Sequence, residues 1–123
     1  MDKRIGAQLY TVRDYMKNEA DYRMMMKKIA EIGYKTVQIS GVCAYEPAWL
    51  KQELDRNGLR CVLTHIPVPQ LTGETEKVIR EHDLFGCRYL RQSRHGHDVA
   101  GQCNDESGSG RYLQISDGNA EVV

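Results

Sequence analysis

Between Arg4 and Leu90, stretches with the apolar spacing of a helix alternate with short apolar runs that suit strands. Three stretches repeat apolar residues every three or four positions, which is the period of an amphipathic helix. Each stretch ends at Gly33, Gly58 or Gly86, and a short apolar run follows each glycine. Glycine suits the residue just after a helix because that position commonly has positive φ. The pattern therefore predicts a repeated unit of helix, glycine and strand.

We expect helices at three places. The first covers about residues 20–32, with an apolar stripe formed by Tyr22, Met25, Met26, Ile29 and Ile32. The second begins near Pro47, because proline is tolerated in the first turn of a helix. The third has Thr72 as its N-cap. His82 falls on or beside the apolar stripe of that third helix, so we expect a packed or half-exposed histidine rather than a ligand.

We expect strands at residues 5–10, 35–40 and 59–65, and a fourth that begins near Cys87. Strands that alternate with helices at this spacing favour parallel pairing through right-handed crossovers. The first two strands each have an apolar face and a polar face, and the polar faces include Gln8, Tyr10 and Gln38.

This alternation distinguishes two α/β architectures. An open, doubly wound sheet has helices on both faces, so its strands tend to be apolar throughout. A TIM barrel directs apolar side chains outward to the helices and polar side chains into its upper interior, where ligands bind. The sequence predicts the α/β class and a partial (β/α)8 TIM barrel of about three and a half βα units.

Composition limits the classes of function. The chain has 123 residues, with 17 Lys and Arg against 17 Asp and Glu. The balanced charge argues against a nucleic-acid partner, which a basic stripe would normally bind. No apolar run approaches the roughly 20 residues of a membrane helix. The first residues lack the apolar region of a signal peptide, so we predict a cytoplasmic protein without a membrane partner.

The four cysteines, Cys43, Cys61, Cys87 and Cys103, have no CxxC spacing and no paired histidine motif. Cys61 and Cys87 lie within apolar, strand-like runs, where a thiol behaves as a small buried hydrophobe. We therefore expect neither a zinc site nor a disulfide framework.

Four segments resemble a known family. They are residues 5–13 (IGAQLYTVR), 28–38 (KIAEIGYKTVQ), 57–67 (NGLRCVLTHIP) and 86–90 (GCRYL). In the same order, they resemble the opening strands of the sugar phosphate isomerases and epimerases with a xylose isomerase-like TIM barrel. One position departs from the family pattern, because the family usually has an acidic residue where this chain has Gln38.

The resemblance implies a metal-dependent enzyme of carbohydrate metabolism that acts on a sugar, sugar phosphate or polyol. In the full-length family a divalent metal (Mn, Mg, Co or Zn) holds the sugar oxygens, and acidic groups move a proton between adjacent carbons. The principal metal ligands come from later strands of the barrel. We therefore expect this chain to be a truncated, inactive fragment that binds no metal and has no catalytic residues.

The resemblance points to four substrate-binding candidates. His65 contacts substrate or metal in one interpretation, since relatives that cleave abasic DNA use a histidine in this region as a zinc ligand, and is an ordinary loop histidine in the other. Gln8, Tyr10 and Gln38 either bind sugar hydroxyls or satisfy one another inside the barrel.

The character of the sequence changes at residue 91. We assign residues 1–90 to the N-terminal portion of the barrel and residues 91–123 to an irregular or disordered tail. His95, His97 and Asp98 form a cluster that we interpret as a solvated loop rather than a metal site. Read one base downstream, several codons of the tail become Met or Thr, so an out-of-frame origin is our hypothesis for this segment.

Two alternatives remain. The chain could be a non-catalytic half-barrel that binds a sugar or self-associates through its open barrel edges. It could also be a relative of the abasic-site endonucleases, which the neutral charge and the lack of a basic stripe disfavour.

Overall fold

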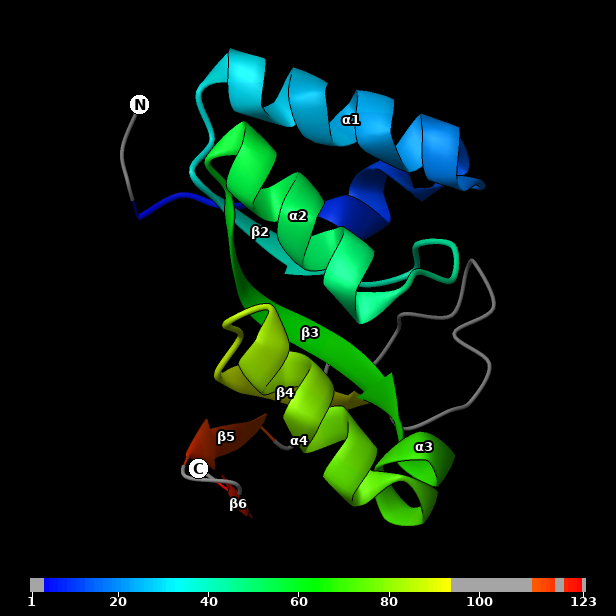
Figure 1. Cartoon of the computed structure of the whole chain (residues 1–123), viewed down its shortest axis with the longest axis vertical. Helices are drawn as coiled ribbons and strands as arrows, with labels where there is room; N and C mark the ends of the chain where they lie inside the picture. Colours follow the sequence, from blue (N-terminus) through cyan, green and yellow to red (C-terminus); the bar gives the residue numbers. More distant parts are fainter. Residues whose placement is uncertain (1–3, 94–111, 117–118, 123) are drawn as a thin grey trace.

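A computed structural model describes residues 4–93, 112–116 and 119–122. Their strands form one sheet in the order β1-β2-β3-β4-β5-β6, and the first four pair in parallel (Figure 1). The elements are β1 (Ala7–Gln8), the 3-10 helix η1 (Leu9–Tyr15), α1 (Glu19–Ile32), β2 (Thr36–Ile39), α2 (Pro47–Asn57), β3 (Arg60–Pro67), α3 (Val68–Gly73), α4 (Thr75–Leu84), β4 (Tyr89–Ser93), β5 (Tyr112–Ser116) and β6 (Asn119–Val122).

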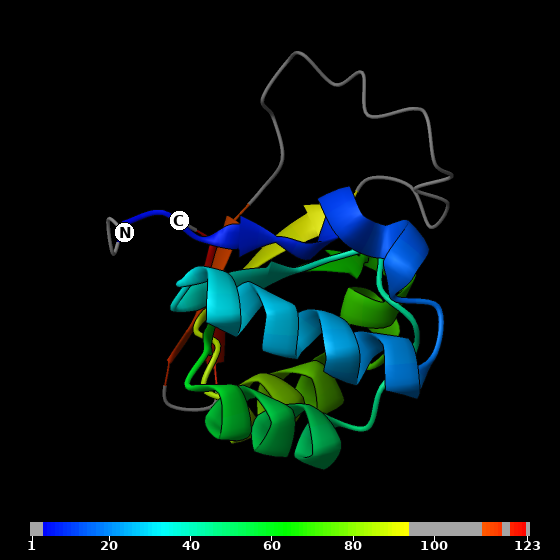
Figure 2. The ribbon, with the colours of Figure 1, turned by 90° about the horizontal axis from the view of Figure 1, so that it is seen from above.

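The three longer helices, α1, α2 and α4, lie on the same face of the sheet (Figure 2). Their apolar stripes meet the apolar positions of the strands in two clusters. The larger cluster joins α1 and α2 to β2 and the start of β3, around Tyr22, Met26 and Leu50. The smaller one joins α4 to β3, β4 and β5, around Val78 and Leu90. Three βα units and a fourth strand are present, which confirms the α/β class and the parallel pairing.

Glycine ends the first two helices as the sequence predicts. Gly33 and Gly58 are the C-caps of α1 and α2, with φ of 117° and 63°. Gly86 also has positive φ, and it lies one residue after Phe85, the C-cap of α4. At the other end of α1, the Asn18 side chain accepts a hydrogen bond from the Asp21 N–H, which satisfies one of the free donors of the first turn.

The first strand is much shorter than predicted. Pairing with β2 is limited to Ala7 and Gln8, and the chain then turns into η1. Local hydrogen bonds replace the ladder here: the Thr11 hydroxyl donates to the Gln8 carbonyl, and the Arg13 guanidinium donates to the Tyr10 carbonyl. Such bonds offer the backbone an alternative to sheet pairing. The expected alternation across residues 5–10 is therefore wrong beyond Gln8.

The third predicted helix is two helices. Thr72 lies inside α3, where its hydroxyl donates to the Val68 carbonyl one turn earlier. Glu74 is the N-cap residue of α4. The expectation of Thr72 as an N-cap is wrong because its hydroxyl is engaged backwards along the chain. The apolar stripe of α4 is as predicted, with Val78, Ile79 and His82 buried.

The tail is not irregular throughout. Leu90, Arg91 and their neighbours extend β4 to Ser93, and β5 and β6 add two antiparallel strands. The apolar positions of β5 alternate with polar ones, and Ile115 is buried against the α4 cluster. An Asp-Gly dipeptide between two such runs is a hairpin signal. The expectation of irregular structure is wrong for these strands, whereas the cluster of His95, His97 and Asp98 lies outside the described residues.

Within residues 4–93, no helix has both the length and the apolar character needed to cross a membrane.

Candidate functional site

Three of the four candidate residues lie on neighbouring strands. Gln8 of β1 is in register with Gln38 of β2, so their side chains leave the same face of the sheet. The Gln38 amide contacts the ring of His65 on β3, with 2.6 Å between Gln38 Nε2 and His65 Nε2. The structure therefore brings Gln38 and His65 together and places Gln8 beside them.

A β-bulge in β3 determines which way His65 faces. Val37 pairs with Cys61, but the next residue, Gln38, pairs with Leu63, so β3 has one extra residue. After this irregularity, Thr64 is buried under the helices and His65 is half-buried. Without the extra residue, the strict alternation of a strand would place Cys61 and His65 on the same face. The bulge therefore directs His65 away from the helix-covered face, on which Cys61 lies.

The contact with Gln38 fixes the tautomer of His65. A carboxamide nitrogen only donates hydrogen bonds, so His65 Nε2 accepts and the neutral ring has its proton on Nδ1. The Gln38 amide has both donors and an acceptor, and the neutral His65 ring has one of each. Groups of this kind recognise hydroxyl and carbonyl oxygens of a polar ligand.

Tyr10 lies elsewhere, in η1. Its ring rests against Gly41, which follows β2 and has φ of +65°, and a Cβ at Gly41 would come within 2.5 Å of the ring. The Arg13 guanidinium stacks on the ring, with 4.1 Å between Arg13 Cζ and the ring centroid. Because η1 replaces the end of the predicted strand, Tyr10 does not continue the row formed by Gln8. Its role as a substrate-binding residue remains a prediction.

The described residues do not fit a divalent metal. They contain no group of three or more His, Cys, Asp or Glu side chains placed to bind an ion. His65 is the candidate with a metal-binding side chain, and its Nε2 is occupied by Gln38. Divalent metals in sugar-binding enzymes need several oxygen or nitrogen donors at once, and the described part of the chain does not bring such a set together.

A second polar pair lies on the helix-covered side of β3. His82 of α4 is buried, and its Nε2 lies 2.5 Å from the Thr64 hydroxyl oxygen. Its Nδ1 lies 2.7 Å from the Val78 carbonyl, which can only accept, so Nδ1 has the proton and Thr64 donates to Nε2. Burial lowers the pKa of His82 below its ordinary value of 6.5. This is the packed histidine that the sequence predicts, and it lies on the opposite side of β3 from His65.

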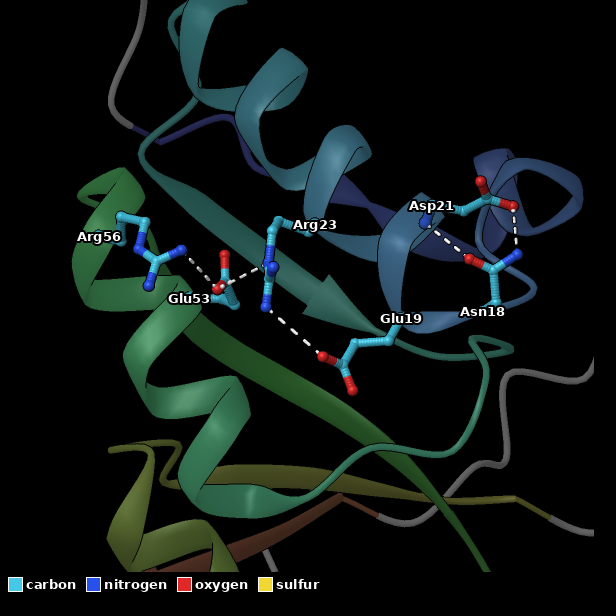
Figure 3. A network of polar contacts seen from close by, with 6 residues as sticks. All are labelled: Asn18, Glu19, Asp21, Arg23, Glu53 and Arg56. Atoms are coloured by element: carbon cyan, nitrogen blue, oxygen red, sulfur yellow. Dashed lines mark hydrogen bonds and ion pairs between the residues drawn. The ribbon is translucent and has the colours of Figure 1, made fainter.

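Sequence reasoning missed an ionic network between α1 and α2 (Figure 3). Glu53 is 1% exposed, and its Oε1 contacts Arg23 Nε at 3.2 Å and Arg56 Nη1 at 3.0 Å. Arg23 also contacts Glu19 on its own helix. Glu53 lies one turn after Leu50, on the apolar stripe of α2. This spacing was the sequence signal that the Glu53 side chain is buried beside Leu50. The network joins two helices and does not reach Gln38 or His65.

No family model and no curated protein matches the chain.

Proposed function

We propose that this chain is the sugar-binding N-terminal part of a (β/α)8 barrel of the sugar phosphate isomerase and epimerase type. The observation that supports this proposal best is the Gln38–His65 pair, with Gln8 in register beside it. Active sites of such barrels lie at the carboxyl ends of the parallel strands. Helices gathered on one face of a parallel sheet, as in Figure 2, also suit a barrel wall.

The proposed ligand is a sugar or sugar phosphate, bound without turnover. A sugar offers several hydroxyl groups, each of which both donates and accepts hydrogen bonds. The amides of Gln8 and Gln38 and the ring of His65 match this requirement, because each amide offers both donors and an acceptor. Isomerisation needs a general base that moves a proton between carbon atoms. The described residues at this site include no carboxylate for that step, so we assign binding alone to them.

Ligand titration tests the proposal. We expect D-fructose or D-fructose 6-phosphate to shift the amide signals of Gln38 and His65 in NMR spectra. Gln38→Leu should weaken binding by about tenfold or more, which corresponds to about 1.4 kcal/mol for lost polar contacts. Gln52→Leu is the matched control, because Gln52 is exposed on α2.

Two outcomes would contradict the binding proposal. One is the absence of any saturable shift for free and phosphorylated aldoses and ketoses, with and without Mn²⁺. The other is equal weakening by Gln38→Leu and Gln52→Leu, which would locate the ligand away from the sheet. Turnover of a sugar by the purified chain would instead contradict the assignment of binding without catalysis.

The edge of the sheet favours a second property, self-association. Among the described strands, β1 is the first in the sheet order and pairs through two residues with β2, so its other side is an edge of that sheet. Exposed edges are templates for pairing with another chain. Ile5 precedes this edge and is 53% exposed.

We expect a concentration-dependent dimer in size-exclusion chromatography with light scattering. Ile5→Lys should shift the protein towards the monomer, because a lysine near an edge opposes pairing. Ile32→Lys is the control, since Ile32 is similarly exposed at the end of α1. A monomer at all concentrations, or equal effects of both substitutions, would contradict association through β1.

A further inference from the structure

Two cysteine thiols that are far apart in the sequence are neighbours in the core. Cys61 of β3 and Cys87, just before β4, are each 1% exposed and unpaired in disulfides. Both belong to one core cluster, and each is close enough to the other to change its pKa. Each thiol also donates towards the carbonyl two residues later, Cys61 to Leu63 at 3.6 Å and Cys87 to Tyr89 at 3.2 Å.

The strand pairing accounts for this proximity. Thr64 pairs with Leu90 where the β3–β4 ladder begins, and Cys61 and Cys87 each precede their member of this pair by three residues and are each buried. Adjacent strands lie about 4.8 Å apart. This separation falls within the range of about 4.4 to 6.8 Å between Cα atoms that a disulfide spans. Two cysteines at neighbouring positions of adjacent strands can therefore be joined by a disulfide.

The Cys61 thiol also has a short connection to the candidate site. Its hydrogen bond ends on the Leu63 carbonyl, at the bulge where Leu63 pairs with Gln38. Gln38 in turn contacts the ring of His65. Loss of the thiol hydrogen would remove the bond to Leu63 and disturb the bulge on which the direction of His65 depends.

We propose that a hydroperoxide converts Cys61 and Cys87 to a disulfide, and that this bond changes the surroundings of His65 through the bulge. Cys87 reacts first, because the adjacent Cys61 thiol stabilises its thiolate and lowers the pKa of Cys87. The Cys87 thiolate attacks one peroxide oxygen, the O–O bond breaks, and hydroxide leaves, which gives a sulfenic acid at Cys87.

The second step forms the disulfide. The Cys61 sulfur attacks the sulfenic sulfur, the S–O bond breaks, and the oxygen leaves as water with the Cys61 proton. The two thiols are oxidised by two electrons in total, and one hydrogen peroxide is reduced to two waters. Because both sulfurs are buried, local opening of the structure admits the peroxide and sets the rate.

Peptide mapping of the full chain after exposure to hydrogen peroxide tests bond formation. We expect a peptide pair linked through Cys61 and Cys87, absent after dithiothreitol treatment and absent in Cys61→Ala and Cys87→Ala. Cys43→Ala is the control and should leave the link unchanged. Links that involve Cys43 or Cys103, stable oxidation of one cysteine, or the absence of a product would each overturn the proposal.

The second readout is the NMR signals of His65, which need no sugar. Its outcome is therefore independent of the proposed function, on which the biological role of the disulfide rests. The ring signals of His65, assigned with His65→Gln, should move on oxidation and return on reduction. The signals of exposed residues on α1, such as Lys27, should stay in place. A disulfide that leaves the His65 signals unmoved would overturn the coupling even if a sugar binds.

Discussion

Tyr22→Phe is expected to raise the free energy of unfolding by about 1 kcal/mol, although Tyr22 is among the most buried residues of the chain. Its hydroxyl has no hydrogen-bond partner among the residues that the structure describes. A buried polar group without a partner loses its hydrogen bonds to water on folding. Burial also raises the pKa of the phenol well above its ordinary value of 10.0, so the hydroxyl stays neutral.

Tyr22→Ala should have the opposite and larger effect, a loss of about 4 kcal/mol. The ring packs edge-on against Trp49, with 5.3 Å between ring centroids, and against Tyr45 at 6.2 Å. Such aromatic contacts add to the area that the side chain buries. The ring joins α1 to α2 and to the loop before α2, so its removal leaves a cavity where these elements meet.

Urea denaturation of the two variants measures both effects. Tyr15 is the matched control because it is 68% exposed, and Tyr15→Phe and Tyr15→Ala should each change stability by less than about 0.5 kcal/mol. A loss of stability in Tyr22→Phe would show that the hydroxyl has a partner in solution. A small effect of Tyr22→Ala would show that the α1–α2 core is not packed as described.

Acid is expected to destabilise the protein through His82, and Thr64→Val should cost about 2 kcal/mol at neutral pH. Thr64 donates to His82 Nε2, so the substitution leaves a buried ring nitrogen without its partner. Protonation of the ring is unfavourable for a different reason, because it places a charge in a buried site, while the Thr64 hydroxyl can turn and accept from the Nε2–H. Phe85 packs beside the ring at 5.0 Å between centroids and offers no polar compensation.

The direction of the pH effect follows from the lowered pKa of His82. In the unfolded chain the ring takes up a proton near its ordinary pKa of 6.5, whereas burial opposes this in the folded state. The contribution to stability is therefore complete above pH 6.5. It declines as the pH falls below 6.5, until the pH reaches the lower pKa of the folded state.

Unfolding free energies at several pH values between about 5 and 8 measure this contribution. His82→Gln should remove the part of the pH dependence that begins near 6.5, while Thr72→Val on α3 is the control for loss of an exposed hydroxyl. Stability that rises on acidification through this range would contradict a buried, neutral His82. So would an unchanged pH profile in His82→Gln.

Sequence reasoning was reliable where one residue type dictates the local backbone. Gly33 and Gly58 have the left-handed backbone that a helix C-cap favours, and the helix stripes predict the buried face except at Ile32. Ile32 was expected in the stripe of α1, but it is 64% exposed because it is the last residue of the helix. The α/β class and parallel strands follow from that repeat. For the candidate site, the sequence predicted the residues but not their partners, since the Gln38–His65 contact depends on the bulge in β3.

Other features depend on contacts that no local pattern encodes. The end of β1 depends on hydrogen bonds from Thr11 and Arg13 to nearby carbonyls, which compete with the ladder. The neighbouring thiols depend on the register between β3 and β4, which Cys61 and Cys87 alone do not reveal. The hairpin of β5 and β6 did have a local signal, the Asp-Gly dipeptide, which the prediction of an irregular tail did not take into account.

The extra residue in β3 also makes the directions of the following side chains depend on the bulge itself. Two adjacent polar residues of β3 face opposite sides of the sheet. Thr64 contacts His82 in the core, and His65 contacts Gln38 on the other side. If β3 ran through Val62 without a bulge, each residue would face the partner of the other. Deletion of Val62 would instead leave Val37 paired with Cys61 and Gln38 with Leu63 in a regular ladder, with both faces kept. Natural variants of this chain should therefore tolerate loss of the residue at Val62 better than a substitution that straightens β3 while its full length is kept.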